Sequence, residues 1–199
     1  MPLGRSLLRQ LPPPPGRFGR VPDFHLTDEN GKPFARADLA GKVWVADFIF
    51  TRCPSVCPLL SQKLEKIQKR TRQLGRAFHL VSFSVDPEHD SSADLLTYAH
   101  RFHANPRGWT FLTGSLGAME EAVVKGFKIA MQKEPRAGET GLFDIVHGEH
   151  LILVDPEGEI RGYYEANDEG IDQLMGAVGL IVNGQSVNGQ SLDTKGIGR

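Results

Sequence analysis

An apolar run from Val43 to Phe50 leads almost directly into Cys53, and Cys57 follows four residues later. The run is rich in β-branched and aromatic residues, a composition typical of a buried strand. The two cysteines are the only ones in the chain. Because α/β sheets place their chemistry beyond the carboxyl ends of central strands, this stretch predicts both a sheet and the position of its functional site.

The remaining apolar patterns predict a regular alternation of strands and helices. Further strands are predicted at 78–85, 109–112, 150–154 and 160–164, and helices after Cys57 up to Gly75 and at 92–102, 119–127 and 171–182. A turn signal at 28–32 predicts an additional N-terminal β-hairpin over 24–35. This order predicts a central mixed β-sheet, parallel in its early strands and antiparallel in its late ones, flanked by helices. We therefore expect an α/β, thioredoxin-like fold.

Length and charge limit the domain organisation and the partners. With 199 residues the chain is expected to form one domain, over 21–182, between a flexible Pro-rich leader (1–20) and a disordered tail (183–199). The formal net charge of −1 argues against a general nucleic-acid binder. No apolar run reaches the ~18 residues of a transmembrane helix, and the leader lacks the apolar core of a signal peptide. A cytoplasmic location stays open, as does export by a segment that this sequence does not contain.

The spacing of Cys53 and Cys57 indicates chemistry more than stabilisation, because a disulfide between them would close too short a loop to add much stability. At the N-terminus of a helix, unpaired N–H groups favour thiolates. Residues one helical turn apart can present both sulfurs on one face, either to one metal ion or to form a disulfide. The usual redox motif has two intervening residues, whereas three lie between these cysteines.

A metal held by two thiolates needs further ligands, and imidazole is a natural third ligand for Cu(I) or Zn²⁺. Of the seven histidines, His147 and His150 lie at the start of the strand predicted at 150–154. From the residues alone either one, or neither, is a ligand. The others are interpreted as surface or helix-face residues: His25, His79, His89, His100 and His103.

Four spaced motifs resemble those of the Sco/SenC family of copper-binding proteins. The segment from Thr51 to Pro58 is similar to the family's T-x-C-P-x-x-C-P signature, and the segment 84–90 to its S-[IV]-D-P-x-x-D motif. The segment 109–114 resembles its L-T-G motif. His147 precedes a D-P-x-G turn at 155–158, as the family's ligand histidine does.

The resemblance implies that the chain binds one copper ion, as Cu(I) or Cu(II), through Cys53, Cys57 and His147, with His150 a less favoured ligand. It implies a role in assembling the dinuclear copper centre of cytochrome c oxidase, as metal donor or as thiol reductant. The implied partners are the oxidase subunit that holds this centre, other copper carriers and thiol reductants. Asp86 matches the family's acid after the second long strand, where it supports the ligands. The implied location is the periplasm or the outer face of the inner membrane.

Other interpretations of the cysteine pair remain open. A thiol-disulfide oxidoreductase or peroxidase would use Cys53 as nucleophile and Cys57 to resolve the intermediate, without a metal and without need of the histidine. A redox or copper sensor would report the state of the pair to a partner. Asp47, in the strand before the cysteines, resembles in position the buried acid of thioredoxins, and is interpreted either as a proton acceptor or as a hydrogen-bonded structural residue.

The predicted helix after Cys57 carries an excess of positive charge. Its polar face has five basic residues against Glu65 alone: Lys63, Lys66, Lys69, Arg70 and Arg72. Two interpretations remain open, a solvated helix face and a docking surface for an acidic partner such as an oxidase subunit.

Overall fold

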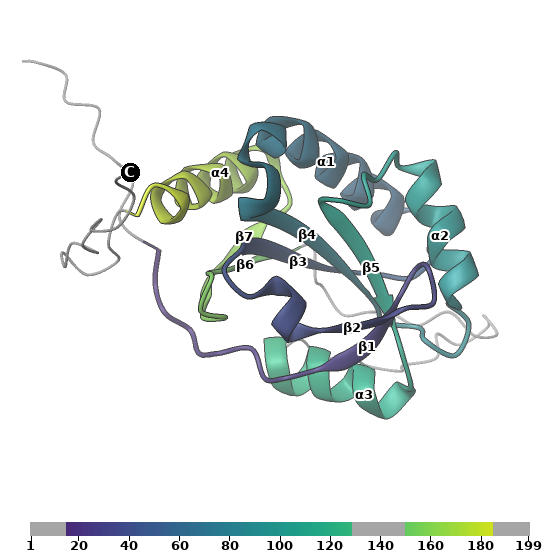
Figure 1. Cartoon of the computed structure of the whole chain (residues 1–199). Helices are drawn as coiled ribbons and strands as arrows, with labels where there is room; N and C mark the ends of the chain where they lie inside the picture. Colours follow the sequence, from purple (N-terminus) through teal and green to yellow (C-terminus); the bar gives the residue numbers. More distant parts are fainter. Residues whose placement is uncertain (1–14, 129–149, 185–199) are drawn as a thin grey trace, which may run out of the picture.

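The computed structural model describes residues 15–128 and 150–184, which form a seven-stranded sheet and its helices (Figure 1). The strands are β1 (His25–Asp28), β2 (Pro33–Ala35), β3 (Val43–Ile49), β4 (Phe78–Ser84), β5 (Trp109–Thr113), β6 (His150–Val154) and β7 (Ile160–Glu165). The α-helices are α1 (Val56–Thr71), α2 (Ser92–Arg101), α3 (Leu116–Glu120) and α4 (Asp168–Val182). Short helical segments are η1 (Arg36–Leu39), η2 (Arg72–Ala77) and η3 (Glu121–Gly126).

The strand order β2-β1-β5-β4-β3-β6-β7 confirms the predicted mixed sheet. β3, β4 and β5 are parallel neighbours, whereas β6 is antiparallel to both β3 and β7. The predicted N-terminal hairpin is formed by β1 and β2, and it extends the same sheet because β1 pairs with β5. The cysteine-bearing strand β3 therefore lies inside the sheet, between β4 and β6.

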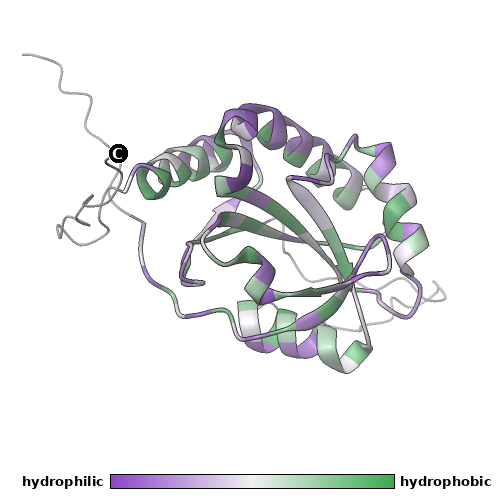
Figure 2. Cartoon of the chain, in the orientation of Figure 1, coloured by the Kyte–Doolittle hydropathy of each residue, from purple (hydrophilic) through white to green (hydrophobic). Residues whose placement is uncertain are grey.

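Helices cover both faces of the sheet. Successive right-handed crossovers from β3 through β4 to β5 place α1 and α2 on one face, where the Ser61 and Tyr98 hydroxyls lie 2.9 Å apart. The helix α4 shares this face, since Arg70 of α1 pairs with Asp172 of α4 at 2.9 Å. The other face carries α3 (Figure 1), which contacts β1. Hydrophilic residues predominate along α1 in Figure 2, as expected for the outer side of an amphipathic helix.

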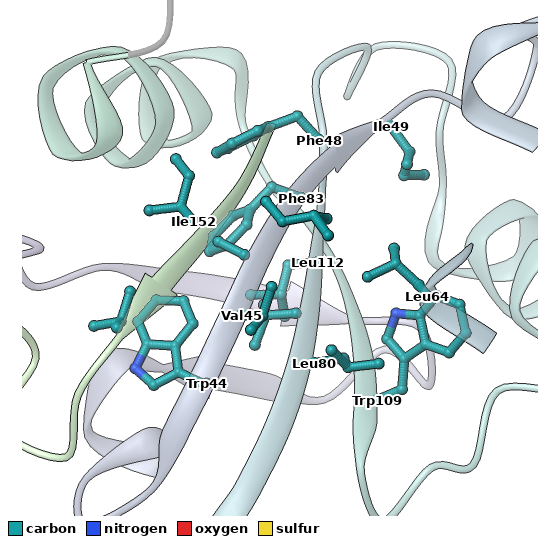
Figure 3. Packing of buried hydrophobic residues seen from close by; sticks show 14 of the residues in the cluster. Trp44, Val45, Phe48, Ile49, Leu64, Leu80, Phe83, Trp109, Leu112 and Ile152 are labelled. Carbon is teal, nitrogen blue, oxygen red and sulfur yellow. The ribbon is translucent and has the colours of Figure 1, made fainter. Parts of the chain in front are cut away.

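Every residue of β3 is buried, and its side chains alternate between the two faces. Trp44 and Phe48 point to the α3 face, where their rings lie 5.9 Å and 5.4 Å from that of Phe127. Alternation then directs Val45, Asp47 and Ile49 toward α1. Figure 3 shows Trp44 and Phe48 on one side of the strands, and Val45 and Ile49 with Leu64 of α1 on the other. The strand thus presents one aromatic face and one face that meets the cysteine-bearing helix.

Three predicted boundaries differ from the structure. The helix after Cys57 begins one residue before that cysteine, at Val56, and the third predicted helix is a short α3 that continues as the π-helical η3. Residues 15–20, assigned to the leader, lie against β7, because the Arg161 guanidinium donates to the carbonyls of Pro15 and Gly16 at 3.0 Å and 2.8 Å. The rest of the predicted leader and nearly all of the predicted tail lie outside the described residues.

Candidate thiol and metal site

Both cysteines lie where β3 ends and α1 begins. Cys53 stands in the connecting loop, where its N–H donates to the carbonyl of Phe50 at 3.2 Å, and Cys57 is the second residue of α1. The N–H of Cys57 donates to the Sγ of Cys53 at 3.3 Å. Both thiols are free; Cys53 is half-buried and Cys57 is buried. The site therefore has one accessible and one enclosed sulfur.

The Cys53 sulfur takes the place of a side-chain cap at the start of α1. Ser55 occupies the cap position, but its side chain accepts no capping hydrogen bond. A capping oxygen ordinarily accepts the N–H of the second or third helical residue, and here the Cys53 sulfur accepts that of Cys57. The Cys53 sulfur therefore lies at the helix N-terminus and accepts a backbone N–H there.

Burial decides the protonation of the second thiol. The pKa of Cys57 is raised far above its ordinary value because the side chain is removed from water, and a hydrogen bond with the backbone of Phe50 offsets this only in part. From the sequence, the helix N-terminus is expected to favour thiolates at both positions. For Cys57 this expectation is wrong without a bound metal, since desolvation is the larger effect.

A buried acid faces α1 beneath the cysteines. Asp47 accepts the Ser82 hydroxyl on Oδ1 at 2.6 Å, and Ser82 in turn accepts the indole N–H of Trp109 at 2.9 Å. Its other oxygen, Oδ2, is buried and has no hydrogen-bond partner among the residues that the structure describes. Burial raises the pKa of Asp47 to about 7, and its charge contributes to the raised pKa of Cys57. Asp47 is therefore held through one oxygen, while its other oxygen is enclosed.

A second buried acid anchors the loop that carries Cys53. Asp90 accepts the Thr51 hydroxyl at 2.5 Å, the Thr51 N–H at 3.2 Å and the Ser84 hydroxyl at 2.6 Å. Its own carbonyl accepts the Thr113 hydroxyl at 2.9 Å. These partners follow or end β3, β4 and β5, so one residue ties the carboxyl ends of three parallel strands together. Burial raises the pKa of Asp90.

Asp86 holds the residue next to Cys53. Its Oδ2 lies 2.7 Å from the Arg52 guanidinium and its Oδ1 lies 2.8 Å from Nδ1 of His89. The Asp86 side chain is almost fully buried, whereas that of Arg52 is half exposed. The predicted supporting acid therefore contacts Arg52 rather than a cysteine.

Of the two histidines predicted as candidate ligands, the structure describes only His150. His147 lies outside the described residues, so its role as a ligand stays a prediction. His150 is half-buried and opens β6, and the pairing of Ala46 with Ile152, extended by two residues, puts it opposite Phe48. Paired residues point to the same face of a sheet, so His150 is directed to the α3 face, away from α1. Within 15–128 and 150–184, no three His, Cys, Asp or Glu residues form a metal-binding group.

Three residues that contact the site were not predicted from the sequence: Arg52, Ser82 and Asp90. Asp90 stands in the 84–90 motif and Arg52 in the cysteine motif, so both were within quoted segments. The missing signal was strand adjacency: Thr51 and Asp90 are 39 residues apart in the chain. Only the parallel pairing of β3 with β4 brings their loops together.

Known proteins are similar to this chain in sequence and in fold. A family model described as SCO1/SenC matches residues 14–181. The SCO1 protein homolog of Bacillus subtilis is 34% identical over 145 residues, covering 72% of each chain.

Two solved structures are similar across almost their whole length. BsSco, described as a member of the Sco family of cytochrome c oxidase assembly proteins with a disulfide switch, is 30% identical with a TM-score of 0.72, covering 87% of this chain and 99% of its own. ScoI of Arabidopsis thaliana, solved with copper bound, is 27% identical with a TM-score of 0.68, covering 82% and 98%. These similarities confirm the thioredoxin-like fold, and the chain belongs to the SCO1/SenC family.

Proposed function

We propose that this protein binds one copper ion through Cys53, Cys57 and His147 and helps to assemble the dinuclear copper centre of cytochrome c oxidase. The observation that carries the proposal is the meeting of its only two cysteines at the N-terminus of α1, with the Cys57 N–H on the Cys53 sulfur. Two soft sulfur donors on one turn suit copper. The relatives described above, one solved with copper and one described as an oxidase assembly protein, support the choice of metal and of task.

Some residues of this chain bind the ion, and others hold the loop that carries Cys53. Cu(I) accepts two thiolates and one imidazole, whereas Cu(II) favours a more tetragonal set of ligands. Because a ligand thiol must be deprotonated and burial raises the pKa of Cys57, copper binding displaces a proton from that thiol. Asp90, through Thr51, and Asp86, through Arg52, keep the Cys53 loop in place as the ion enters or leaves.

Two hand-over reactions are open to this site. In the first, Cu(I) moves without change of oxidation state to two partner cysteines, whose thiol protons are replaced by the ion while Cys53 and Cys57 regain protons. In the second, the Cys53–Cys57 dithiol gives two electrons and two protons to a partner disulfide and is itself oxidised to a disulfide. The partner in both is the oxidase subunit with the dinuclear centre, and other copper carriers or thiol reductants restore the starting state.

The test is an anaerobic titration of the fully reduced protein with Cu(II) and, separately, Cu(I). We expect a one-to-one complex, with sulfur-to-copper charge-transfer absorption in the Cu(II) form. This absorption should change in His147→Ala and persist in the matched control His150→Ala. A protein that forms no stable copper complex would contradict the proposal, and an effect of His150→Ala alone would move the nitrogen ligand to that residue.

A second candidate function, thiol-disulfide exchange without metal, is favoured by the unpartnered Oδ2 of Asp47. In this reaction the Cys53 thiolate attacks a partner disulfide, forming a mixed disulfide and releasing one partner thiolate. The Cys57 sulfur then attacks Cys53, releasing the second partner thiolate and forming the Cys53–Cys57 disulfide. Asp47, with its pKa near neutrality, accepts the Cys57 proton. Asp47→Asn should slow this second step and remove its dependence on a group that titrates near pH 7.

We place the protein in the periplasm or at the outer face of the inner membrane, where the resemblance puts the family. In the part of the chain that the structure describes, no helix has the length and apolarity to cross a membrane. Fractionation of the native cells, with the oxidase as membrane marker, tests this location. Recovery of the protein with cytoplasmic markers would contradict it.

A further inference from the structure

The first turn of α1 exposes large apolar side chains beside the thiols. Val56 is 44% exposed and Leu59 is 57% exposed, and they lie on either side of Cys57 in the sequence. Only two other large hydrophobic residues in the described chain are exposed, Phe18 and Val124. Half of the exposed large apolar side chains among the described residues are thus within two positions of Cys57.

Basic residues follow the exposed apolar residues along the same side of α1. Positions 56, 59, 63, 66 and 70 follow helical spacing and lie on one stripe, which we call the α1 strip: Val56, Leu59, Lys63, Lys66 and Arg70. Glu65 lies off the strip and pairs with Lys69 and His103. Arg70 pairs with Asp172 of α4, whereas Lys63 and Lys66 take part in no ion pair among the described residues. The strip is therefore apolar at the thiol end and positive beyond it.

The more accessible thiol lies next to this strip. Cys57 is buried, so an incoming sulfur or copper site must reach Cys53, which is half-buried. Two sulfurs that share an ion or exchange a disulfide come within bonding distance, about 2 Å for a disulfide. A partner domain that reaches Cys53 comes close to the first turn of α1, and Lys63 and Lys66 lie farther along the same stripe of the helix.

We propose that the α1 strip is the docking surface for an acidic partner domain that presents its own copper-binding cysteines. The proposal rests on the function proposed above and adds where the partner binds and what charge it carries. The apolar first turn packs against the rim of the partner's copper site and excludes water from the exchanging ligands. The lysines pair with carboxylates of the partner, because unpaired cations on one stripe are complementary to negative charge.

The first test measures the second-order rate of copper transfer, and the dissociation constant, with the soluble, reduced copper-centre domain of an oxidase subunit as probe. The strip variant Lys63→Glu/Lys66→Glu is compared with Lys32→Glu/Lys125→Glu, which changes the net charge equally at exposed positions off α1. At low ionic strength we expect the strip variant to transfer copper on the order of tenfold or more slowly, and the control within about twofold of the unchanged protein. Added salt should slow the unchanged protein and barely affect the strip variant.

Equal effects of the two double variants would overturn the docking proposal. Both should bind copper with unchanged stoichiometry, since none of these lysines belongs to the thiol site. If the unchanged protein passes neither copper nor electrons to the probe, the proposed function fails. The docking proposal is then still decided by whether the strip variant, and not the control, weakens binding of the probe.

A second comparison isolates the apolar half of the strip. Leu59→Ser should weaken the complex about tenfold in a salt-independent way, chiefly by raising the dissociation rate. Val124→Ser, at an exposed apolar position on η3 on the other face of the sheet, is the matched control. Equal affinity of the two variants would remove the first turn of α1 from the interface.

Discussion

The two faces of β3 bury different kinds of side chain, aromatic rings on one and a carboxyl group on the other. On the α3 face the strand contributes Trp44 and Phe48 to a cluster of aromatic rings that includes Phe83 and Phe127. On the α1 face it contributes Asp47, a buried acid with one unpartnered oxygen, beneath the cysteines. Burial of apolar rings stabilises a fold, whereas burial of an incompletely bonded carboxyl opposes folding. Burial of the aromatic rings on the α3 face therefore stabilises the fold, whereas burial of Asp47 on the α1 face lowers that stability.

The largest expected effect comes from the aromatic face. Phe83 is fully buried, and its ring lies 5.5 Å from Phe24, 5.9 Å from Phe48 and 5.2 Å from Phe127. Phe83→Ala should lower the free energy of unfolding by about 3–5 kcal/mol, through lost burial and the cavity left behind. Urea unfolding of the reduced protein measures this, with Phe83→Leu as the milder control. Alkylation of Cys53 in the folded protein should keep its rate, and a large change in that rate would show that the faces are not separate.

Replacement of the buried acid on the α1 face should stabilise the protein. An unfolded chain releases the Asp47 proton near pH 3.8, whereas the folded protein retains it to about pH 7. Between these values the folded state binds more protons, so the Asp47 contribution to the free energy of unfolding decreases as pH rises. Asp47→Asn removes this loss and should be more stable by on the order of 3 kcal/mol at pH 8, with little difference at pH 4.

The measurement for Asp47 is the difference in the free energy of unfolding between Asp47→Asn and the unchanged protein, from pH 4 to 8. Taking the difference cancels other titrating groups, among them His79, whose pKa is lowered to about 4 by burial. A difference that stays constant with pH would mean that Asp47 titrates normally. Burial of Asp47 on the α1 face would then not lower the free energy of unfolding.

A smaller loss is expected from the anchor of the cysteine loop. Thr51→Val removes the hydroxyl that donates to Asp90 at 2.5 Å but keeps the backbone N–H contact. Loss of one hydrogen bond to a buried carboxyl should cost about 1–3 kcal/mol. The variant should also show faster alkylation of Cys53, because the loop is less firmly held, whereas Thr51→Ser should restore both properties. Unchanged alkylation together with lowered stability would make this contact purely structural.

The smallest effect on stability is expected at Arg52. Its side chain is 49% exposed and pairs with Asp86, which also has His89 as a partner. Arg52→Gln should therefore change the free energy of unfolding by less than about 1 kcal/mol. Copper dissociation kinetics, followed with a Cu(I) chelator, should nevertheless quicken because Arg52 adjoins Cys53. A stability loss well above this limit would show that the ion pair behaves as a buried one.

Local patterns were sufficient for the elements and the family. The apolar run that ends before Cys53 predicted β3, and helical spacing after Cys57 predicted the body of α1, because strand and helix periodicities are properties of adjacent residues. The motifs around Cys53 and Asp86 identified the family on the same basis. Boundaries were less well predicted. η3 is π-helical, and residues 15–20 lie against Arg161 of β7, which is far from them in the sequence.

By itself, the sequence determined that a thioredoxin-like α/β sheet carries its only two cysteines at the end of a central strand, with an acid in that strand. The tertiary structure decided which sulfur is accessible, that burial raises the pKa of Cys57, and that one oxygen of Asp47 has no partner. It also brought Asp90 into contact with Thr51, 39 residues away in the chain. The pairing of β6 with β3 placed His150 on the α3 face of the sheet. The physical reason is that desolvation and hydrogen bonding depend on which segments meet in space, whereas periodicity records only which residues follow one another.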